Sequence, residues 1–318
     1  MHSNLKTRTL RALQHYQGLA GLILLLIVAL LLDRRFFEPD NLQNILQQLA
    51  IPGVLAVGMT FVIVSGGIDL SVGSLLALLN CVVATWGKAG TPLLPTALYV
   101  LALGTFVGAI MGGVIGATRM QPFVVTLGGM VSLRGVSFLY TQNSNVSGIS
   151  DFLAPLQGNR MGLPISGWIM IVLALLGGLL LAKSVFGRHI YAIGGNVRAA
   201  RLSGVPVDRV RIQAYAFNGF CVAVAALLLT ARTNNGQPGA AMNYELDAIA
   251  AVVIGGASLL GGFGNVFGSL VGAIFILCTN ILLVLQGVND KVGLGLKGII
   301  LLLAVYLQNL GRHQGESS

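Results

Sequence analysis

Residues 187–204 read GRHIYAIGGNVRAARLSG and form the centre of the one long polar interruption in a chain that is otherwise mostly apolar. The surrounding residues 183–211 hold one acid, Asp208, and the cations Lys183, Arg188, Arg198, Arg201, Arg209 and Arg211. In a membrane protein, a short loop rich in Lys and Arg stays in the cytoplasm. We therefore expect this loop to fix the orientation of the other segments and to be the surface where the protein meets a partner.

The composition predicts a membrane protein. Of 318 residues, 55% are hydrophobic and 9% are charged, and the mean hydropathy is +0.84, whereas soluble domains carry roughly 25% charged residues. The net charge of +9 does not indicate nucleic-acid binding, because the basic residues flank apolar runs. Cys81, Cys221 and Cys278 lie inside apolar runs and predict no disulfide framework.

The apolar runs predict an all-α polytopic membrane protein with roughly ten transmembrane helices, forming a single transmembrane domain over residues 1–318. We predict spans at 19–32, 49–65, 71–86, 92–116, 122–139, 167–182, 213–231, 248–260, 266–285 and 293–308. Residues 41–49, with Asn41 as cap, predict a short helix at the outer interface. The tails 1–17 and 310–318 are then cytoplasmic, and counting the crossings also places 183–211 inside, in agreement with its charge.

Two glycine-rich segments predict broken or re-entrant helices, because irregular backbone at membrane depth needs protein or a water-filled cavity around it. Their candidate break or gating residues are Gly66, Gly67, Asp69, Ser71, Gly73 and Ser74, and Gly255, Gly256, Gly261, Gly262 and Gly264. Asp69 has two readings: a cap on the free amides of Val72 or Gly73, or a direct role in conduction or gating. Residues 72–75 (VGSL) and 267–270 (FGSL) indicate a candidate internal repeat, a feature of many transporters.

Small residues recur at four-residue spacing in two predicted spans, a pattern that allows close helix packing. They are Gly104, Gly108, Gly112 and Gly116, and then Gly264, Gly268 and Gly272. Arg134 lies inside another span, where it either snorkels or pairs with a partner that the sequence does not identify. No GxxxxGK[ST], HExxH or GxSxG motif occurs, and the four histidines suggest no metal cluster. We therefore expect no catalytic, cofactor or metal residues and no enzyme activity of this chain alone.

Three stretches, GMTFVIVSGGIDLSVGS (58–74), GRHIYAIGGNVRAARLSGV (187–205) and YELDAIAAVVIGGASLLGGFG (244–264), resemble the permease subunits of bacterial ribose-type ABC sugar importers. Branched-chain amino-acid permeases are more distant relatives. The resemblance implies an inner-membrane permease for a monosaccharide, ribose by first preference, with a second permease copy and a periplasmic sugar-binding protein. It also implies a cytoplasmic ATPase subunit that binds the ATP and Mg²⁺.

In that family reading, the basic loop resembles the coupling helix that docks in a groove of the ATPase. The coupling residues would be Gly187, Arg188, Gly194, Gly195, Asn196, Arg198, Ala199, Ala200, Arg201, Leu202 and Gly204. Ala199, Ala200 and Leu202 would form an apolar knob; the plainer reading is that the charges only set topology. Candidate residues along the sugar path are Asn80, Thr126, Ser132, Asn218 and Asn280. The alternative is a secondary sugar transporter or channel that acts alone and uses Asp69.

Overall fold

The computed structural model describes residues 3–288, 292–293, 295–296 and 298–299, and within them most of the chain is helical. The longer helices are α1 (Ser3–Leu32), α2 (Pro39–Val64), α3 (Val72–Lys88), α4 (Leu93–Thr118), α5 (Pro122–Tyr140), α7 (Ile165–Lys183), α10 (Val207–Thr233) and α12 (Val266–Leu285). The shorter ones are η1 (Arg34–Phe37), α6 (Ser150–Leu153), η2 (Ala154–Leu156), α8 (Val185–Gly195), α9 (Val197–Leu202) and α11 (Tyr244–Ile254).

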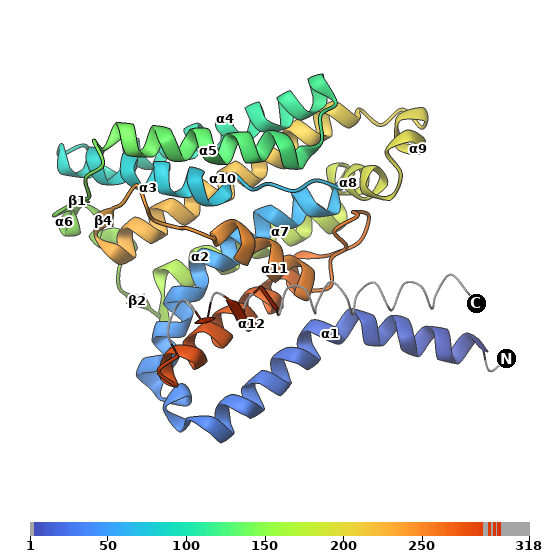
Figure 1. Ribbon diagram of the computed structural model, residues 1–318, viewed down its shortest axis with the longest axis horizontal. Helices are drawn as coiled ribbons and strands as arrows, with labels where there is room; N and C mark the ends of the chain where they lie inside the picture. The colour runs from blue at the N-terminus through green and yellow to red at the C-terminus, as the bar shows by residue number, and fades with distance from the viewer. Residues whose placement is uncertain (1–2, 289–291, 294, 297, 300–318) are drawn as a thin grey trace.

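Six of the described helices, α2, α4, α5, α7, α10 and α12, are long and apolar enough to cross a membrane. The helix α2 passes through the centre of the bundle and α10 lies beside it (Figure 1). In the apolar stretch of α2, 83% of the residues are buried, against 17% in α5. Large apolar side chains on α4, α5 and α7 are correspondingly exposed. In water this would be unfavourable, and it is what a lipid-covered surface requires.

Glycines on α4 allow α4 and α10 to pack with their backbones close together. A Cβ atom added at Gly104 would lie 2.6 Å from the carbonyl oxygen of Gly219, and one at Gly112 would lie 2.8 Å from Cα of Ile212. Gly108 faces the Tyr215 carbonyl oxygen in the same way. The packing role predicted for the four-residue register is therefore confirmed.

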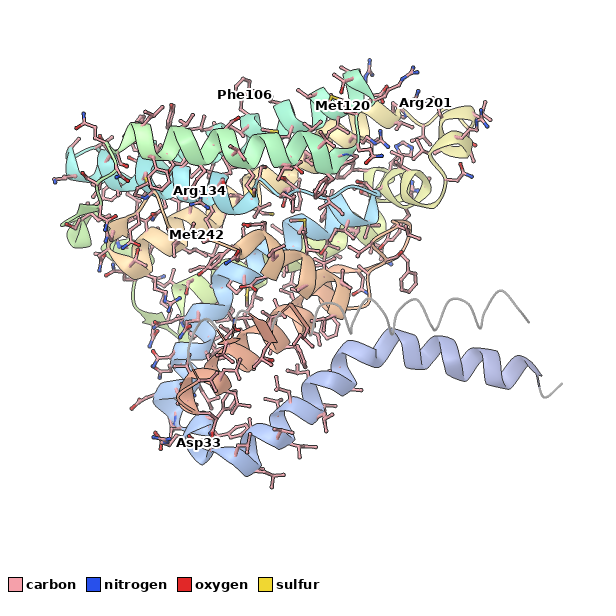
Figure 2. The ribbon with its side chains drawn as sticks, in the orientation of Figure 1. Asp33, Phe106, Met120, Arg134, Arg201 and Met242 are labelled. Carbon is pink, nitrogen blue, oxygen red and sulfur yellow. The ribbon has the colours of Figure 1, made fainter. Side chains whose placement is uncertain are left out.

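The two ends of the bundle differ in character. The start of α1, the α8–α9 pair and Met120 in the α4–α5 turn lie toward one end (Figures 1 and 2). Short two-stranded ribbons mark the opposite end: β1 (Val146–Ser147) pairs antiparallel with β4 (Asn235–Gly236), and β2 (Asn159–Arg160) with β3 (Leu163–Pro164). We call these the basic end and the ribbon end.

Two predicted segments differ in the structure. Residues 41–49 do not form a separate interfacial helix but continue into the span as part of α2, which tolerates Pro52 in its interior. The predicted span 248–260 is wrong as a crossing helix: α11 has 11 residues, which extend about 16 Å and cannot cross a 30 Å hydrocarbon core. It ends at Gly255, where the second glycine-rich segment begins. The predicted span 293–308 and the tail 310–318 lie almost wholly outside the described residues.

Candidate functional site

The basic loop folds into two short helices, each with its own cap. Ser184 Oγ accepts a hydrogen bond from the Gly187 amide at 2.9 Å at the start of α8. Asn196 Oδ1 accepts one from the Ala199 amide, also at 2.9 Å, at the start of α9. Side-chain caps of this kind satisfy amides that the first turn leaves free. Residues 184–202, which we call the α8–α9 segment, are therefore a defined surface on the basic end rather than a loose loop.

The exposed face of α9 is polar and basic, with one apolar side chain that stands out. Leu202 is 85% exposed, and Arg198 and Arg201 are also exposed. Arg201 forms an ion pair with Asp208 at 3.1 Å in which both side chains remain half exposed. Ala200 is buried, so the apolar knob predicted from Ala199, Ala200 and Leu202 must be corrected. Ala200 faces inward and anchors α9, while Leu202 projects outward.

Four glycines bring the α8–α9 segment into backbone contact with both helix breaks. A Cβ atom at Gly194, near the end of α8, would overlap the Val64 carbonyl oxygen and the Gly262 amide nitrogen and would lie 3.0 Å from Gly262 Cα. The Gly262 amide donates a hydrogen bond to the Val64 oxygen at 2.9 Å. A Cβ atom at Gly261 would lie 2.8 Å from Gly66 Cα. We call Gly66, Gly194, Gly261 and Gly262 the glycine junction.

The conformation of the second break depends on glycine. Gly261 and Gly262 have φ values of +87° and +75°, which only glycine adopts readily. A further bond ties this break to α8, because the Tyr191 hydroxyl donates to the Gly264 carbonyl oxygen at 2.7 Å. The predicted break residues Gly66, Gly261 and Gly262 and the predicted coupling residue Gly194 therefore meet in one place, whereas Asp69, Gly73 and Gly255 have other neighbours.

The first break is closed by Asp69, whose side chain is buried. Its Oδ1 accepts hydrogen bonds from the Ser71 amide at 2.9 Å and the Ser71 hydroxyl at 2.6 Å. Its Oδ2 accepts one from Asn218 Nδ2 of α10 at 2.8 Å. The carboxylate thus caps the entry to α3 through Ser71 rather than through Val72 or Gly73, and its oxygens are occupied by donors.

The carbonyl oxygen of Ile68, next to Asp69, accepts two side-chain bonds. The Tyr215 hydroxyl donates from α10 at 3.1 Å, and the Thr126 hydroxyl donates from α5 at 3.2 Å. Irregular backbone at membrane depth is stable only when such groups are paired. The contacts show how α5 and α10 hold the first break.

The two sequence-similar segments occupy the same local position, the first turn of a helix that follows a break. Residues 72–75 begin α3 and residues 267–270 lie in the first turn of α12. From the middle of the molecule, α3 runs toward the ribbon end and α11 runs toward the basic end (Figure 1). Helices that begin or end at a break within the membrane line binding sites in many transporters.

Glu245 is a residue whose position the sequence did not predict. It lies in the first turn of α11, is buried, and points its Oε2 atom at Gly73 in the first turn of α3. That oxygen has no hydrogen-bond partner among the described residues. Only its place just before an apolar run hinted at burial.

Arg134, whose partner the sequence left open, holds the segment that leads to Glu245. Its Nη1 atom donates to the carbonyl oxygens of Pro238 at 2.9 Å and Ala240 at 2.7 Å. Figure 2 labels Arg134 on α5 and Met242 in the segment that precedes α11. The guanidinium therefore satisfies backbone oxygens that would otherwise be unpaired at this depth.

The five candidate path residues are not gathered into one site. Asn80 is buried and donates to Thr230 Oγ1 at 2.8 Å and to the Asn235 carbonyl oxygen at 3.0 Å, while its Oδ1 accepts from the Gln237 amide at 2.8 Å. Asn218 and Thr126 hold the first break, as described above. Ser132 is exposed on α5 and Asn280 is half-buried on α12. Their role in sugar passage stays a prediction.

Within the described ranges, no three His, Cys, Asp or Glu side chains are grouped closely enough to hold a metal ion. The three cysteines are buried and free. The arrangement found here is one of helix breaks joined to a surface segment, which suits the transmission of movement.

Three known proteins that are similar to this chain, and the family that it matches, are described as permeases. Residues 41–305 match the family described as branched-chain amino acid transport system, permease component. The chain is 38% identical to the ribose import permease protein of Haemophilus influenzae, with 94% of each chain covered. It is 40% identical to the ribose import permease protein of Escherichia coli K12 (93% and 94% covered) and 36% identical to the xylose transport system permease protein of that organism (87% and 86% covered). No solved structure matches the chain.

Proposed function

Because the chain belongs to the family of branched-chain amino acid transport system permease components, we propose that it is the membrane permease of an ATP-binding-cassette importer for a monosaccharide, with ribose as the first candidate. The single observation that carries this proposal is the 38–40% identity to ribose import permeases over almost the whole chain. The similarity to a xylose permease supports pentoses and related sugars as the class of substrate.

In this proposal, a separate cytoplasmic ATPase subunit binds ATP and Mg²⁺ and supplies the work. The sequence has no phosphate-cradling motif of its own, so the energy must enter by contact. The exposed Leu202 and the cations of α9 form the contact surface. Movement of α8 then passes through the glycine junction, where backbone touches backbone and little compression is available.

We further propose that the basic end faces the cytoplasm, because it carries the Lys- and Arg-rich segment 183–211. The N-terminal start of α1 lies at that end as well (Figure 1). With the protein in the inner membrane, the ribbon end would then face the periplasm and receive sugar from a binding protein. Alternating access follows if closure of the ATPase moves both helix breaks together.

A second copy of the permease is the proposed neighbour of α5. This helix exposes most of its surface, and Gly128, Ser132 and Gly135 line one exposed face. A Cβ atom at Gly128 or Gly135 would have no neighbour within 4 Å. Small residues at i, i+4 and i+7 allow a second helix to approach closely in a membrane.

The alternative of a secondary transporter that uses Asp69 is less well supported. An ion-coupling carboxylate needs free oxygens, whereas both oxygens of Asp69 accept hydrogen bonds from Ser71 and Asn218. We therefore assign Asp69 a capping role.

The test is sugar uptake into proteoliposomes that contain the permease, its ATPase and its binding protein. We expect uptake to require ATP and all three components, with ribose as the best competitor. Leu202→Glu should lower uptake by at least about tenfold, because burying an unpaired carboxylate in a protein contact costs more than about 1.4 kcal/mol. Met120→Glu changes an exposed apolar residue at the same end and should leave uptake unchanged. Uptake by the permease alone, driven by a proton gradient, would reject the proposal.

A further inference from the structure

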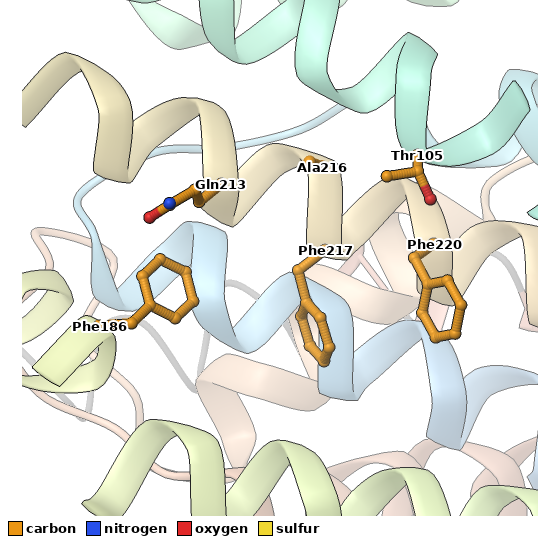
Figure 3. A pocket seen from close by; sticks show the side chains of 6 residues that line it. All are labelled: Thr105, Phe186, Gln213, Ala216, Phe217 and Phe220. Carbon is orange, nitrogen blue, oxygen red and sulfur yellow. The ribbon is translucent and has the colours of Figure 1, made fainter. Parts of the chain in front are cut away.

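An open groove of about 430 Å³ lies beside α10, on the side away from the first helix break. Figure 3 shows its six lining residues: Thr105 from α4, Phe186 from α8, and Gln213, Ala216, Phe217 and Phe220 from α10. Four of these contribute apolar surface, and three of them are phenylalanines. The groove opens beside α4, whose apolar side chains are largely exposed.

The aromatic wall of the groove is fixed by packing. The rings of Phe217 and Phe220 stack with centroids 6.4 Å apart. Phe61, in the core, contacts both Phe217 and Phe186, with centroid distances of 4.4 Å and 6.0 Å. Gln213, Phe217 and Phe220 share one face of α10, because they are four and three residues apart. From Gln213 to Phe220 the groove extends about 10 Å along the helix.

Exposed cations lie within four residues in sequence of the lining residues Gln213 and Phe186. Arg209 lies one turn before Gln213 on the same face of α10 and is exposed. Lys183 is the last residue of α7, three residues before Phe186, and is also exposed. Arg188 Nη1 lies 3.5 Å from the Lys183 carbonyl oxygen, which places a third cation nearby. Asp208, next to Arg209, is paired with Arg201.

The chemistry of the groove therefore changes along its length from aromatic to amide to cationic. An acyl chain fits the aromatic part, since no buried polar group there would lose a partner. A phosphate fits the end, because a negative charge near each Lys or Arg at a membrane surface is favourable. An anionic phospholipid carries both groups in this order.

We propose that this groove binds one anionic phospholipid, with an acyl chain against Phe217 and Phe220 and the phosphate against Arg209 and Lys183. The charge complementarity selects the anionic headgroup, and the aromatic lining of the groove beside membrane-spanning helices selects the acyl chain. The site is distinct from the glycine junction and from the two helix breaks. It lies in the leaflet at the basic end of the molecule.

The test places the full chain in nanodiscs with equal parts of phosphatidylglycerol and phosphatidylcholine, and native mass spectrometry then counts the lipids retained. We expect one phosphatidylglycerol to be retained in preference to phosphatidylcholine. Loss of each cation should weaken retention about fivefold. The double variant Lys183→Gln/Arg209→Gln should therefore abolish the preference, whereas Arg119→Gln, an exposed cation in the α4–α5 turn, should preserve it.

A second pair of variants tests the acyl-chain part of the groove. Phe220→Ala should reduce retention of both lipids, because it removes one wall. Phe106→Ala removes an aromatic ring that is 61% exposed on the outer face of α4 (Figure 2) and should have no effect. Circular dichroism and gel filtration verify the fold of each variant. Equal retention of the two lipids by the unchanged protein would overturn the proposal, as would retention that the double variant leaves intact.

Discussion

Adding one methyl group at Gly194 should damage this protein far more than adding it at the neighbouring Gly195. At Gly194 the new carbon overlaps the Val64 carbonyl oxygen and the Gly262 amide, which are hydrogen-bonded to each other. At Gly195 the same carbon has no neighbour within 4 Å. The two substitutions change helix propensity equally, so the difference between them isolates the contact at the glycine junction.

The magnitude follows from what the methyl group meets. Overpacking costs about 1–3 kcal/mol when side chains can adjust. Here the obstructing atoms are backbone atoms of both helix breaks, which cannot rotate away, so we place Gly194→Ala at the upper end, about 3 kcal/mol. That corresponds to a fall in Tm of about 5 °C or more for a chain of this size. Gly195→Ala should be neutral or slightly stabilising.

Two measurements on the same preparations separate stability from coupling. Thermal unfolding in detergent gives the Tm of each variant, and ATP-driven uptake in proteoliposomes gives the transport rate. If α8 transmits force through the junction, Gly194→Ala should lower uptake even at temperatures well below its Tm, while ATP hydrolysis by the partner continues. Equal Tm values and equal uptake for the two alanine variants would refute the role of the junction.

Three further predictions concern topology, the capping carboxylate and a buried amide. Reporter fusions at Asn145 and Val197, which lie toward opposite ends of the bundle (Figure 1), should report opposite sides of the membrane, and the same side for both would contradict the orientation. Asp69→Asn should retain transport, because the new amide keeps an acceptor for Ser71 and a turned Asn218 amide offers its otherwise unpaired oxygen; loss of uptake in a stable variant would show that the charge itself is needed. Asn80→Leu should lower the free energy of unfolding by about 3 kcal/mol, since three hydrogen bonds of about 1 kcal/mol each are lost, and an unchanged unfolding midpoint in detergent would contradict this.

Much of the fold could be predicted from local pattern. The spans at 92–116, 122–139, 167–182, 213–231 and 266–285 agree with α4, α5, α7, α10 and α12 to within a few residues at most ends. These helices are long uninterrupted apolar runs, and a run of that length has few other stable states in a bilayer. The predicted span 248–260 failed because apolar composition alone does not separate a half-length helix from a full crossing. The glycines that end α11 determine the difference.

The candidate site could be predicted in its parts but not in its assembly. The glycines at 66, 194, 261 and 262 were each identified as break or coupling residues, yet they are separated by up to almost two hundred positions in the chain. Their meeting depends on how α2, α8 and the segment after α11 pack. The inward orientation of Ala200 and the burial of Glu245 likewise depend on neighbours that no local pattern names.

The sequence by itself determined that this chain crosses a membrane many times, that residues 183–211 carry its strongest positive charge, and that two helices break at glycine. Each of these follows from composition and from the free energy of transferring a short stretch of residues from water into lipid. That free energy depends on the residues of the stretch itself. Only the tertiary structure decided that the basic segment touches both breaks and that Asp69 is held by Ser71 and Asn218. Contacts between distant segments depend on the packing of whole helices, and that packing is set by the shapes of all their faces together.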